Sequence, residues 1–367
     1  MNIKKAIDKL LGEIFISLFL FVKKFSIKKG RPKFKKILAI RLFGMGDAIL
    51  ISSLLQDIKE KNKNLDISAI TTDETKKIFE MRNIKTYNIS FNLHFPISLL
   101  KLMKNARKVD LIIDTEQFTS FSSIVCFLLR PKWSIGFWSK PSLRKELYDE
   151  IVFYDANKHT IFTFADILKK AGFKFEVKLR KFNVKKEDKN FVKKFLYANN
   201  VRKDDFVVGI HPGTGTSAIH RRWNPEKFAE VANYLIRNYN AKIILTGTKS
   251  ERDLIKFIAL KMIRKPIVAI ELSLPQFVAL LERMNLFLSN DTGPMHLAAS
   301  MDIPVVGIFG PTTPVRWRPF NKKSTYIYKK LPCSPCINTH LGIVPEKCLL
   351  YKKPKCIEEI SVEEVLE

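Results

Sequence analysis

Residues 36–50 read KILAIRLFGMGDAIL, and this stretch decides the fold class. The apolar run at 36–41 predicts a buried strand, the loop at 42–46 carries two glycines, and a helical pattern begins near Asp47. This strand–loop–helix order is the first half of a unit in which a crossover helix joins two parallel strands. A sheet of this kind requires the same order to recur along the chain.

The alternation continues through the first half of the chain. Further strands are predicted at 65–71, near Tyr87, at 109–114 and at 134–137, the last of which is expected to close the sheet. Helices are predicted between them at 73–82, 97–107 and 160–171. Strands that alternate with helices predict a parallel sheet with crossover connections.

A second series follows a polar, charged region. Its strands are predicted at 206–210, 242–246, 286–289 and 304–309, and its helices begin near Pro225, Ser250 and Pro275. The fold class is therefore α/β, with two doubly wound domains facing across a cleft. A basic amphipathic extension is predicted at 1–35, before a first domain at 36–180. A linker at 181–205 leads to a second domain at 206–330, and a cysteine-bearing segment follows at 331–367.

Gly44, Gly46 and Asp47 follow the first strand. Glycines let backbone N–H groups approach a ligand closely, and a helix N-terminus favours an anion. The third glycine of a dinucleotide fingerprint is absent, and no suitable acid follows the second strand, so a nicotinamide site is poorly supported. Asp47 is either a functional carboxylate or an ordinary helix cap.

Polar residues follow three strands of the second series. Carboxyl ends of parallel strands meet at one edge of a sheet, where open α/β folds bind ligands. Two adjacent arginines beside a glycine-rich turn suit a diphosphate, and Pro294 places the two residues before it at a helix N-terminus. Each turn alone has a structural explanation, but together they favour a ligand site. The candidates are Thr214, Gly215, Arg221, Arg222, Gly247, Glu251, Asp291, Thr292, Gly293 and His296.

The chain is strongly basic, with a formal net charge of +28, and residues 1–36 hold eleven Lys or Arg against two acids. Such a field attracts nucleic acid, anionic lipid or phosphorylated substrates, unless it only reflects a lysine-rich composition. Residues 3–25 carry an apolar helical stripe, and the uncharged run 14–22 is too short to span a bilayer. We expect this segment to lie on an anionic membrane, or alternatively to pack on the protein itself. No signal peptide and no nucleic-acid partner are expected.

Four of the five cysteines lie near the C-terminus, and Cys126 stands in an apolar run typical of a core. The spacing C-x2-C-x11-C-x7-C permits a tetrathiolate zinc site, although its second half is wide for a zinc knuckle. Disulfides or simple thiols are the alternatives. The four are Cys333, Cys336, Cys348 and Cys356.

Several of these motifs together resemble glycosyltransferase family 9, the ADP-heptose:lipopolysaccharide heptosyltransferases. The resemblance covers roughly residues 36–360 and is carried by RLFGMGD, HPGTG…RRWNPEKF, LTGT…E, SNDTGPMHLAA and PVVGIFGPT. It implies a GT-B fold, with the acceptor in the N-terminal domain and the donor nucleotide in the C-terminal one. Asp47 would be the general base, and Arg221 stands where a lysine is common in the segment that binds the donor diphosphate. Asp291, Thr292 and Gly293 match the D-T-G motif, and Glu251 matches an acid implicated in holding the nucleotide sugar.

The resemblance implies an inverting transfer of a heptose from ADP-heptose to a lipopolysaccharide precursor, without a cofactor. No D-x-D motif is present, which favours a metal-independent reaction. The expected location is cytoplasmic, peripheral on the inner membrane. The alternatives are a relative that uses another nucleotide-sugar donor, a nucleotide-sugar epimerase, an inactive relative, and a non-catalytic protein that binds polyanions.

Overall fold

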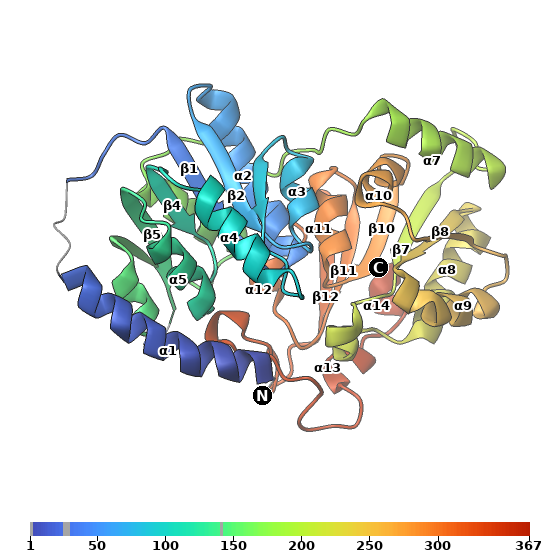
Figure 1. The fold of residues 1–367 in the computed structure, drawn as a ribbon. Coiled ribbons are helices and arrows are strands. Elements are labelled where there is room, and N and C mark those ends of the chain that lie inside the picture. Colours follow the sequence, from blue (N-terminus) through green and yellow to red (C-terminus); the bar gives the residue numbers. More distant parts are fainter. Residues whose placement is uncertain (1–2, 25–29, 140–141) are drawn as a thin grey trace. The chain divides into compact units, whose positions relative to one another are not determined.

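The structure is a computed structural model that describes residues 3–24, 30–139 and 142–367, without the side chains of residues 3–11, 24, 216 and 217. The chain forms two compact units (Figure 1). Unit 1 runs through Lys178 and includes Thr339–Ile343, and unit 2 comprises Leu179–Asn338 and Val344–Glu367.

Unit 1 is built on a parallel six-stranded sheet of order β3-β2-β1-β4-β5-β6. The strands are β1 Lys36–Ile40, β2 Asp66–Thr71, β3 Lys85–Asn88, β4 Leu111–Asp114, β5 Trp133–Trp138 and β6 Glu150–Phe153. The central strand β1 is buried on both faces after its first residue, as a parallel sheet covered by helices requires. The order is that of a doubly wound fold, in which the chain leaves β1 toward one edge and returns to the other.

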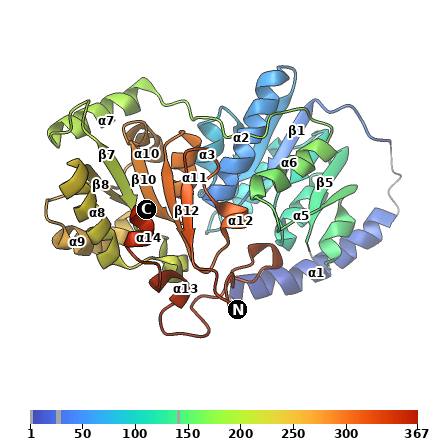
Figure 2. The same ribbon diagram turned by 180° about the vertical axis from the view of Figure 1, so that it is seen from behind.

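Helices cover both faces of this sheet. They are α2 Met45–Lys61, α3 Lys76–Glu80, α4 Phe95–Asn105, α5 Ser120–Leu128 and α6 Thr160–Lys170, with a 3-10 helix η1 Leu143–Leu147. Figure 1 shows α4 and α5 over one face, and Figure 2 shows α2 and α6 over the other. The core under α4 and α5 joins residues of β1 and β4 to Leu102 and Val125, and Cys126 is buried there as predicted.

Two elements of unit 1 differ from the expectation. The segment 134–137 does not close the sheet, because β6 lies outside β5 at the edge. Strand β6 alternates between half-buried and exposed residues over only four positions, so its apolar signal is weak. Helix α5 is uniformly apolar or small and shows no polar face that would mark it in the sequence.

The N-terminal helix α1, Ile3–Lys24, packs on unit 1 through one of its faces. Gly12 lies so close to Ser120 that a Cβ on it would be 2.3 Å from Ser120 Cβ. Ile16 is 1% exposed, and the ring of Phe19 stacks on Phe127 with centroids 5.0 Å apart. The alternative of a helix packed on the protein is therefore confirmed for this face.

The opposite face of α1 is exposed. Its uncovered apolar side chains are Ile14, Phe15, Leu18, Phe21 and Val22. The parts of the predicted extension at residues 1–2 and 25–29, including Phe25 of the apolar stripe, lie outside the described residues. No helix within the described ranges has both the length and the apolar character needed to cross a bilayer.

Unit 2 repeats the plan with a parallel sheet of order β12-β11-β10-β7-β8-β9. The strands are β7 Val207–His211, β8 Lys242–Gly247, β9 Ile267–Ile270, β10 Leu286–Asn290, β11 Val305–Phe309 and β12 Thr325–Tyr328. Strands β7, β8 and β10 end at the three polar turns singled out in the sequence. Because these strands are neighbours in the order β10-β7-β8, the three turns lie at one edge of the sheet.

The helices of unit 2 lie on both faces of this sheet. They are α7 Lys186–Ala198, α8 Pro225–Tyr239, α9 Arg252–Lys261, α10 Leu274–Leu281, α11 Gly293–Ser300, α12 Pro314–Trp317, α13 Lys355–Glu358 and α14 Glu363–Leu366. The 3-10 helices are η2 Thr216–Arg221 and η3 Lys249–Glu251, and a further one, η4 Thr339–Leu341, belongs to unit 1. Figure 2 shows α8, α9, α13 and α14 on the same side of the unit.

The predicted linker at 181–205 and the cysteine-bearing segment are folded parts of unit 2. Helix α7 occupies much of the linker and packs on α10, with Lys189 paired to Glu282 at 2.9 Å. Near the C-terminus, Ile357 and Ile360 are buried in the core with α8, and Trp223 Nε1 donates to the Ile360 carbonyl at 3.0 Å. Residues beyond 330 therefore help to complete the second core.

Candidate active site

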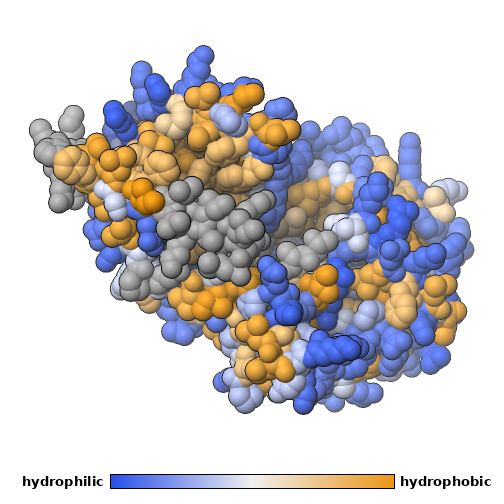
Figure 3. Space-filling model, turned by 60° about the horizontal axis from the view of Figure 1, so that its bottom comes forward, coloured by the Kyte–Doolittle hydropathy of each residue, from blue (hydrophilic) through white to orange (hydrophobic). Residues whose placement is uncertain are grey.

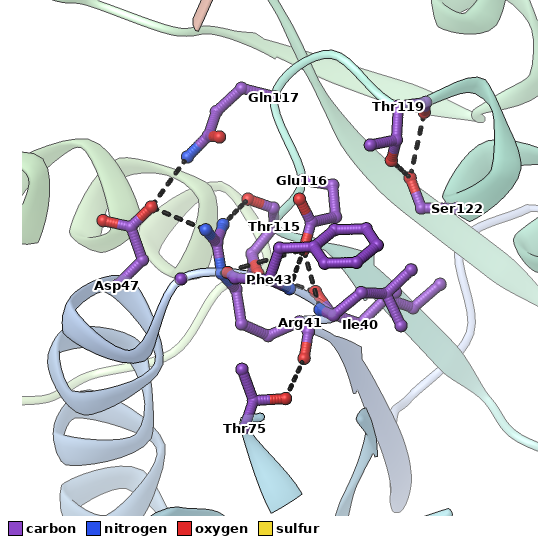
Figure 4. A network of polar contacts seen from close by, with 12 residues as sticks. Ile40, Arg41, Phe43, Asp47, Thr75, Thr115, Glu116, Gln117, Thr119 and Ser122 are labelled. Carbon is purple, nitrogen blue, oxygen red and sulfur yellow. Dashed lines mark hydrogen bonds and ion pairs between the residues drawn. The ribbon is translucent and has the colours of Figure 1, made fainter. Parts of the chain in front are cut away.

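Asp47 lies in the first turn of α2, beside the buried side chain of Arg41. Arg41 Nη2 donates to Asp47 Oδ2 at 2.6 Å, and Gln117 Nε2 lies 3.5 Å from the same oxygen (Figure 4). The Arg41 guanidinium also donates to the carbonyls of Phe43 and Thr115, at 2.7 and 3.0 Å. One carboxylate oxygen of Asp47 is thereby fixed, while no hydrogen bond to Oδ1 is seen among the described residues.

Glu116 is the second acid that faces Arg41, and it is 1% exposed. Its Oε1 accepts from the backbone N–H groups of Leu42 and Phe43, at 2.7 and 3.2 Å, and lies 3.7 Å from Arg41 Nε. Burial raises the pKa of Glu116, and Arg41 opposes that shift. Burial favours a lower pKa for Arg41, but Glu116 and Asp47 outweigh it and raise the pKa of Arg41. Glu116 thus ties the end of β4 to the loop that precedes Asp47.

A second buried ion pair, Arg144 with Asp114, contacts the backbone of Glu116. Arg144 Nη2 lies 3.2 Å from Asp114 Oδ2 and donates to the Tyr148 hydroxyl at 2.8 Å. Both terminal nitrogens of Arg144 also donate to the Glu116 carbonyl at 3.1 Å. Buried ion pairs are tolerated only where their remaining hydrogen-bonding groups are satisfied, and this network meets much of that need. Arg144 thereby fixes the backbone of Glu116, whose side chain holds the N–H groups of Leu42 and Phe43.

The two glycines of this loop occupy different positions. Gly44 is the N-cap of α2, with a φ of 82° that favours glycine, and its N–H donates to Glu74 Oε1 at 3.0 Å. A Cβ there would lie 3.2 Å from Arg41 Nη2. Gly46, expected in the loop, is already inside α2, so the helix begins earlier than predicted. Interpreting Asp47 as a helix cap is wrong, because Gly44 holds that position.

Unit 1 also contains a cavity of about 480 Å³ between β3 and α4. Polar side chains of Asn88, His94 and Lys101 line part of it. None of the residues singled out in the sequence lies there. The cavity is a second place, besides the Asp47 loop, where unit 1 presents polar groups to a ligand.

In unit 2, Glu251 joins two of the three strand ends. Its Oε1 accepts from the Gly215 N–H at 3.0 Å, and its Oε2 accepts from the Thr248 N–H and hydroxyl, both at 2.9 Å. These hydrogen bonds lower the pKa of Glu251 against the opposing effect of burial. A Cβ on Gly213 would lie 2.0 Å from Glu251 Oε1, and a Cβ on Gly247 would lie 3.4 Å from Oε2. The glycines therefore make room for this carboxylate.

The two adjacent arginines make different contacts. Arg222 Nε donates to Thr214 Oγ1 at 3.2 Å, and its Nη2 donates to the Gly215 carbonyl at 3.3 Å. Arg221 Nη1 lies 3.7 Å from Asp291 Oδ2, and its side chain is 23% exposed. Arg222 thus braces the glycine-rich turn, while Arg221 connects that turn to the end of β10. The two cations, Glu251 and Asp291 share one edge of the sheet.

The end of β10 leads directly into α11, which begins at Gly293 as Pro294 predicts. Thr292 is its N-cap, but the Thr292 hydroxyl donates to the Asn290 carbonyl at 3.2 Å and does not cap the helix. The backbone N–H groups of the first turn are consequently not capped by this side chain. His296, one turn further, is buried at 2% exposure, so it belongs to the packing of α11.

Four residues of these two sites were not among the predicted site residues, although His211 and Asn290 lie within the quoted motifs. In unit 1, Arg41 comes directly after β1 and Glu116 comes two residues after β4, so a charged residue close behind an apolar strand was the available signal. In unit 2, Asn290 accepts from the Trp223 N–H and donates to the Pro212 carbonyl, at 3.0 and 2.8 Å. His211 Nδ1 lies 3.0 Å from Thr246 Oγ1, and burial lowers the pKa of His211 to about 4.

The four C-terminal cysteines are free thiols. Burial is the largest cause that raises the pKa of Cys356, to about 12, and the other three cysteines contribute to that shift. Across the described ranges, which include all four, no group of three or more His, Cys, Asp or Glu is arranged to hold a metal ion. The zinc site stays a prediction without support from this geometry.

Comparison with known proteins identifies the family. The family model described as glycosyltransferase family 9 (heptosyltransferase) matches residues 99–341. The lipooligosaccharide heptosyltransferase 2 of Campylobacter jejuni is 28% identical over 327 residues, which cover 86% of this chain and 95% of that protein.

Solved structures agree on the fold. A family 9 glycosyltransferase from Veillonella parvula has a TM-score of 0.74 at 21% identity and covers 93% of this chain and 97% of its own. The ADP-heptose lipopolysaccharide heptosyltransferase II of Escherichia coli has a TM-score of 0.69 at 17% identity. The match covers 90% of this chain and 96% of that protein. The expected GT-B fold, with two doubly wound parallel sheets, is confirmed. The chain belongs to glycosyltransferase family 9 and is a glycosyltransferase.

Proposed function

We propose that the protein transfers a heptose from ADP-heptose to a lipopolysaccharide-core acceptor with inversion at the anomeric carbon. The observation that carries the proposal is the carboxylate of Asp47, held by Arg41 through one oxygen only. A general base needs a fixed orientation and an oxygen within reach of the proton that it removes. Family membership favours this transfer over the epimerase and the polyanion-binding alternatives.

The reaction is a single displacement. Asp47 Oδ1 takes the proton of the acceptor hydroxyl while that oxygen forms a bond to the anomeric carbon. The bond from the anomeric carbon to the diphosphate oxygen breaks on the opposite side, and ADP leaves with the electron pair. Charge is spread over an oxocarbenium-like transition state, as in other reactions at glycosidic carbons. The product carries the opposite anomeric configuration.

Unit 2 would bind the donor along the edge where β10, β7 and β8 end. Arg221 and Arg222 supply the positive charge that a leaving diphosphate needs, and the α11 N-terminus adds its partial positive charge. Asp291 orients Arg221, and Glu251 shapes the turn at Gly215. In this proposal Glu251 acts mainly by building the donor site, because its oxygens already accept three hydrogen bonds.

Stabilisation of the leaving group by arginines and backbone N–H groups is an alternative to a divalent ion. We therefore propose a reaction that needs no metal. An anionic ligand is supported by the arginines after β7 and by the uncapped N-terminus of α11 after β10.

The acceptor would bind to unit 1, near Asp47 and the cavity beside α4. We propose that the protein works on the cytoplasmic side of the inner membrane as a peripheral protein. The exposed apolar face of α1 and the excess of nine positive charges in residues 1–36 support an anionic membrane surface as partner.

Thermal stabilisation by nucleotides tests the donor. A ligand that binds only the native state raises the melting temperature by mass action. We expect ADP to raise it more than UDP, GDP or CMP, equally with and without EDTA, and the shift to be lost in Asp291→Ala. Asp302→Ala, which removes an acid half-exposed at 45% and paired with Lys323, is the matched control. A preference for UDP or GDP would overturn the ADP-heptose assignment, and a shift that requires a divalent ion would overturn metal independence.

A further inference from the structure

Unit 1 carries an apolar surface that extends well beyond α1. On α4 and the loop before it, Leu93, Ile97 and Leu100 are 96%, 52% and 70% exposed. On α5, Leu128 is 37% exposed. We call these side chains, together with the exposed apolar face of α1, the α1–α4 face.

The three helices of this face are in direct contact. Phe19 of α1 stacks on Phe127 of α5, and Phe121 of α5 packs against Phe91 and Phe95, with ring centroids 5.3 and 5.9 Å apart. Helix α5 therefore lies between α1 and α4. Figure 3, which turns this side of the molecule toward the reader, shows hydrophobic residues gathered there.

These aromatic rings also connect the face to the loop that precedes Asp47. The ring of Phe91 stacks on that of Phe43, with centroids 5.8 Å apart, and both rings are exposed by more than a third. Phe43 lies in the loop between Arg41 and Asp47, where Glu116 holds its backbone N–H. A molecule that rests on this face would therefore lie next to the proposed catalytic loop.

Basic residues predominate around the face, although α1 itself carries Asp8 and Glu13. No acid occurs in residues 81–109 or in residues 117–145. At the end of α4 and just after it, four cations are exposed: Lys101, Lys104, Arg107 and Lys108. Exposed apolar side chains beside exposed cations are complementary to a bilayer with anionic head groups. The apolar side chains insert into the interface, and the cations bind the phosphate groups. Protein interfaces, by contrast, are depleted in lysine.

We infer that the α1–α4 face is a membrane-docking surface that binds an anionic lipid bilayer. The exposed apolar side chains of α1 and of α4 would both contact the bilayer. This inference deepens the proposed function and rests on it, because a lipid-linked acceptor would be presented beside the Asp47 loop. Deleting α1 would be a poor test, since α1 covers Ser120 and Phe127. Substitutions on exposed positions leave that packing intact.

Vesicle co-sedimentation of the full-length protein tests the inference. The vesicles are phosphatidylcholine, alone or with about a third phosphatidylglycerol, a composition that sets the surface potential. One variant is Leu93→Ser with Leu100→Ser, neither of which lines the cavity beside α4. The other is Ile14→Ser with Leu18→Ser, 60% and 58% exposed. The control is Leu260→Ser, which removes a leucine of α9 in unit 2 that is 76% exposed.

We expect binding to anionic vesicles to fall at least tenfold in each double variant and to stay unchanged in the control. Equal binding to neutral and anionic vesicles, or wild-type binding by the Leu93 and Leu100 variant, would overturn the inference. A lipid-free dimer that this variant disrupts would overturn it too, because the face would then bind a second copy. Stabilisation by ADP, measured in the same variants, reports the donor site separately. If the wild type binds ADP but does not bind anionic vesicles, only this inference fails and the proposed donor site stands.

Discussion

At the scale of single residues, the site depends on charges that are fixed by burial. Arg41 makes contacts with four groups at once, which only the forked guanidinium can do. Asp47 is the least buried member of the set, with a side chain that is 14% exposed. In the proposed mechanism the buried residues orient Asp47, and Asp47, the more accessible carboxylate, meets the substrate.

Arg41→Lys tests this division of roles. Lysine keeps a positive charge beside Glu116 but cannot reach Asp47, Phe43 and Thr115 together, so Asp47 should lose its orientation. We expect kcat to fall by tenfold or more, equivalent to about 1.4 kcal/mol, with little change in the donor KM. Arg237→Lys, at an exposed position of α8, is the control. An Arg41→Lys enzyme with wild-type kcat would show that Arg41 does not position Asp47.

His211 makes stability depend on pH. Its pKa is about 4 in the folded protein against an ordinary value of 6.5, because burial disfavours the charged ring. Between these values the unfolded chain binds a proton that the folded one does not, so the free energy of unfolding rises with pH over this interval. We expect His211 to contribute up to about 3 kcal/mol of that rise. Urea unfolding at pH 4.5 and 7 should show a smaller difference in His211→Gln, and an equal one would refute the assignment.

At the scale of elements, the sequence predicts best where strands end in distinctive turns. The turns after β7, β8 and β10 were found from glycine, threonine and aspartate that follow apolar runs. The contact between Glu251 and Gly215 was not, because periodicity does not show which side chain fills the space that a glycine leaves. Glu116 and Leu42 are likewise far apart in the sequence, and only strand order brings them together.

Two element errors have a common cause. Helix α7 buries only Val192 and Leu196, so its charged sequence predicts a linker and not a helix. Strand β6 is short and half exposed at the edge of its sheet. Elements with a small apolar face give a weak periodic signal, whereas central strands such as β1 give a strong one.

The docking of α1 depends on the close approach at Gly12. A valine there would drive its Cβ into Ser120, so α1 should loosen from α5. We expect Gly12→Val to speed limited proteolysis near Lys23 several-fold, because local opening exposes the backbone. Ser17→Val places the same residue on the exposed side of α1 and serves as the control. Equal cleavage rates in the two variants would mean that Gly12 does not fix α1.

At the scale of the whole molecule, the proposed function divides the chemistry between two doubly wound units. Unit 1 supplies the carboxylate and the apolar basic face, and unit 2 supplies the cations and backbone groups suited to a diphosphate. The charge excess that was evident in the sequence has a local counterpart, since residues 81–109 and 117–145 hold no acid. The division fits a reaction in which a lipid-linked acceptor and a soluble donor arrive separately.

The most direct test of the central claim is heptose transfer from ADP-heptose to a heptose-deficient lipopolysaccharide acceptor, comparing wild type with Asp47→Asn. Loss of a general base typically costs a factor of about 10² to 10⁴ in rate. We predict transfer by the wild type, a loss of about a hundredfold or more in Asp47→Asn, and unchanged stabilisation of both by ADP. Transfer by Asp47→Asn at the wild-type rate would contradict the role of Asp47, and absence of transfer by the wild type would contradict the assigned donor and acceptor.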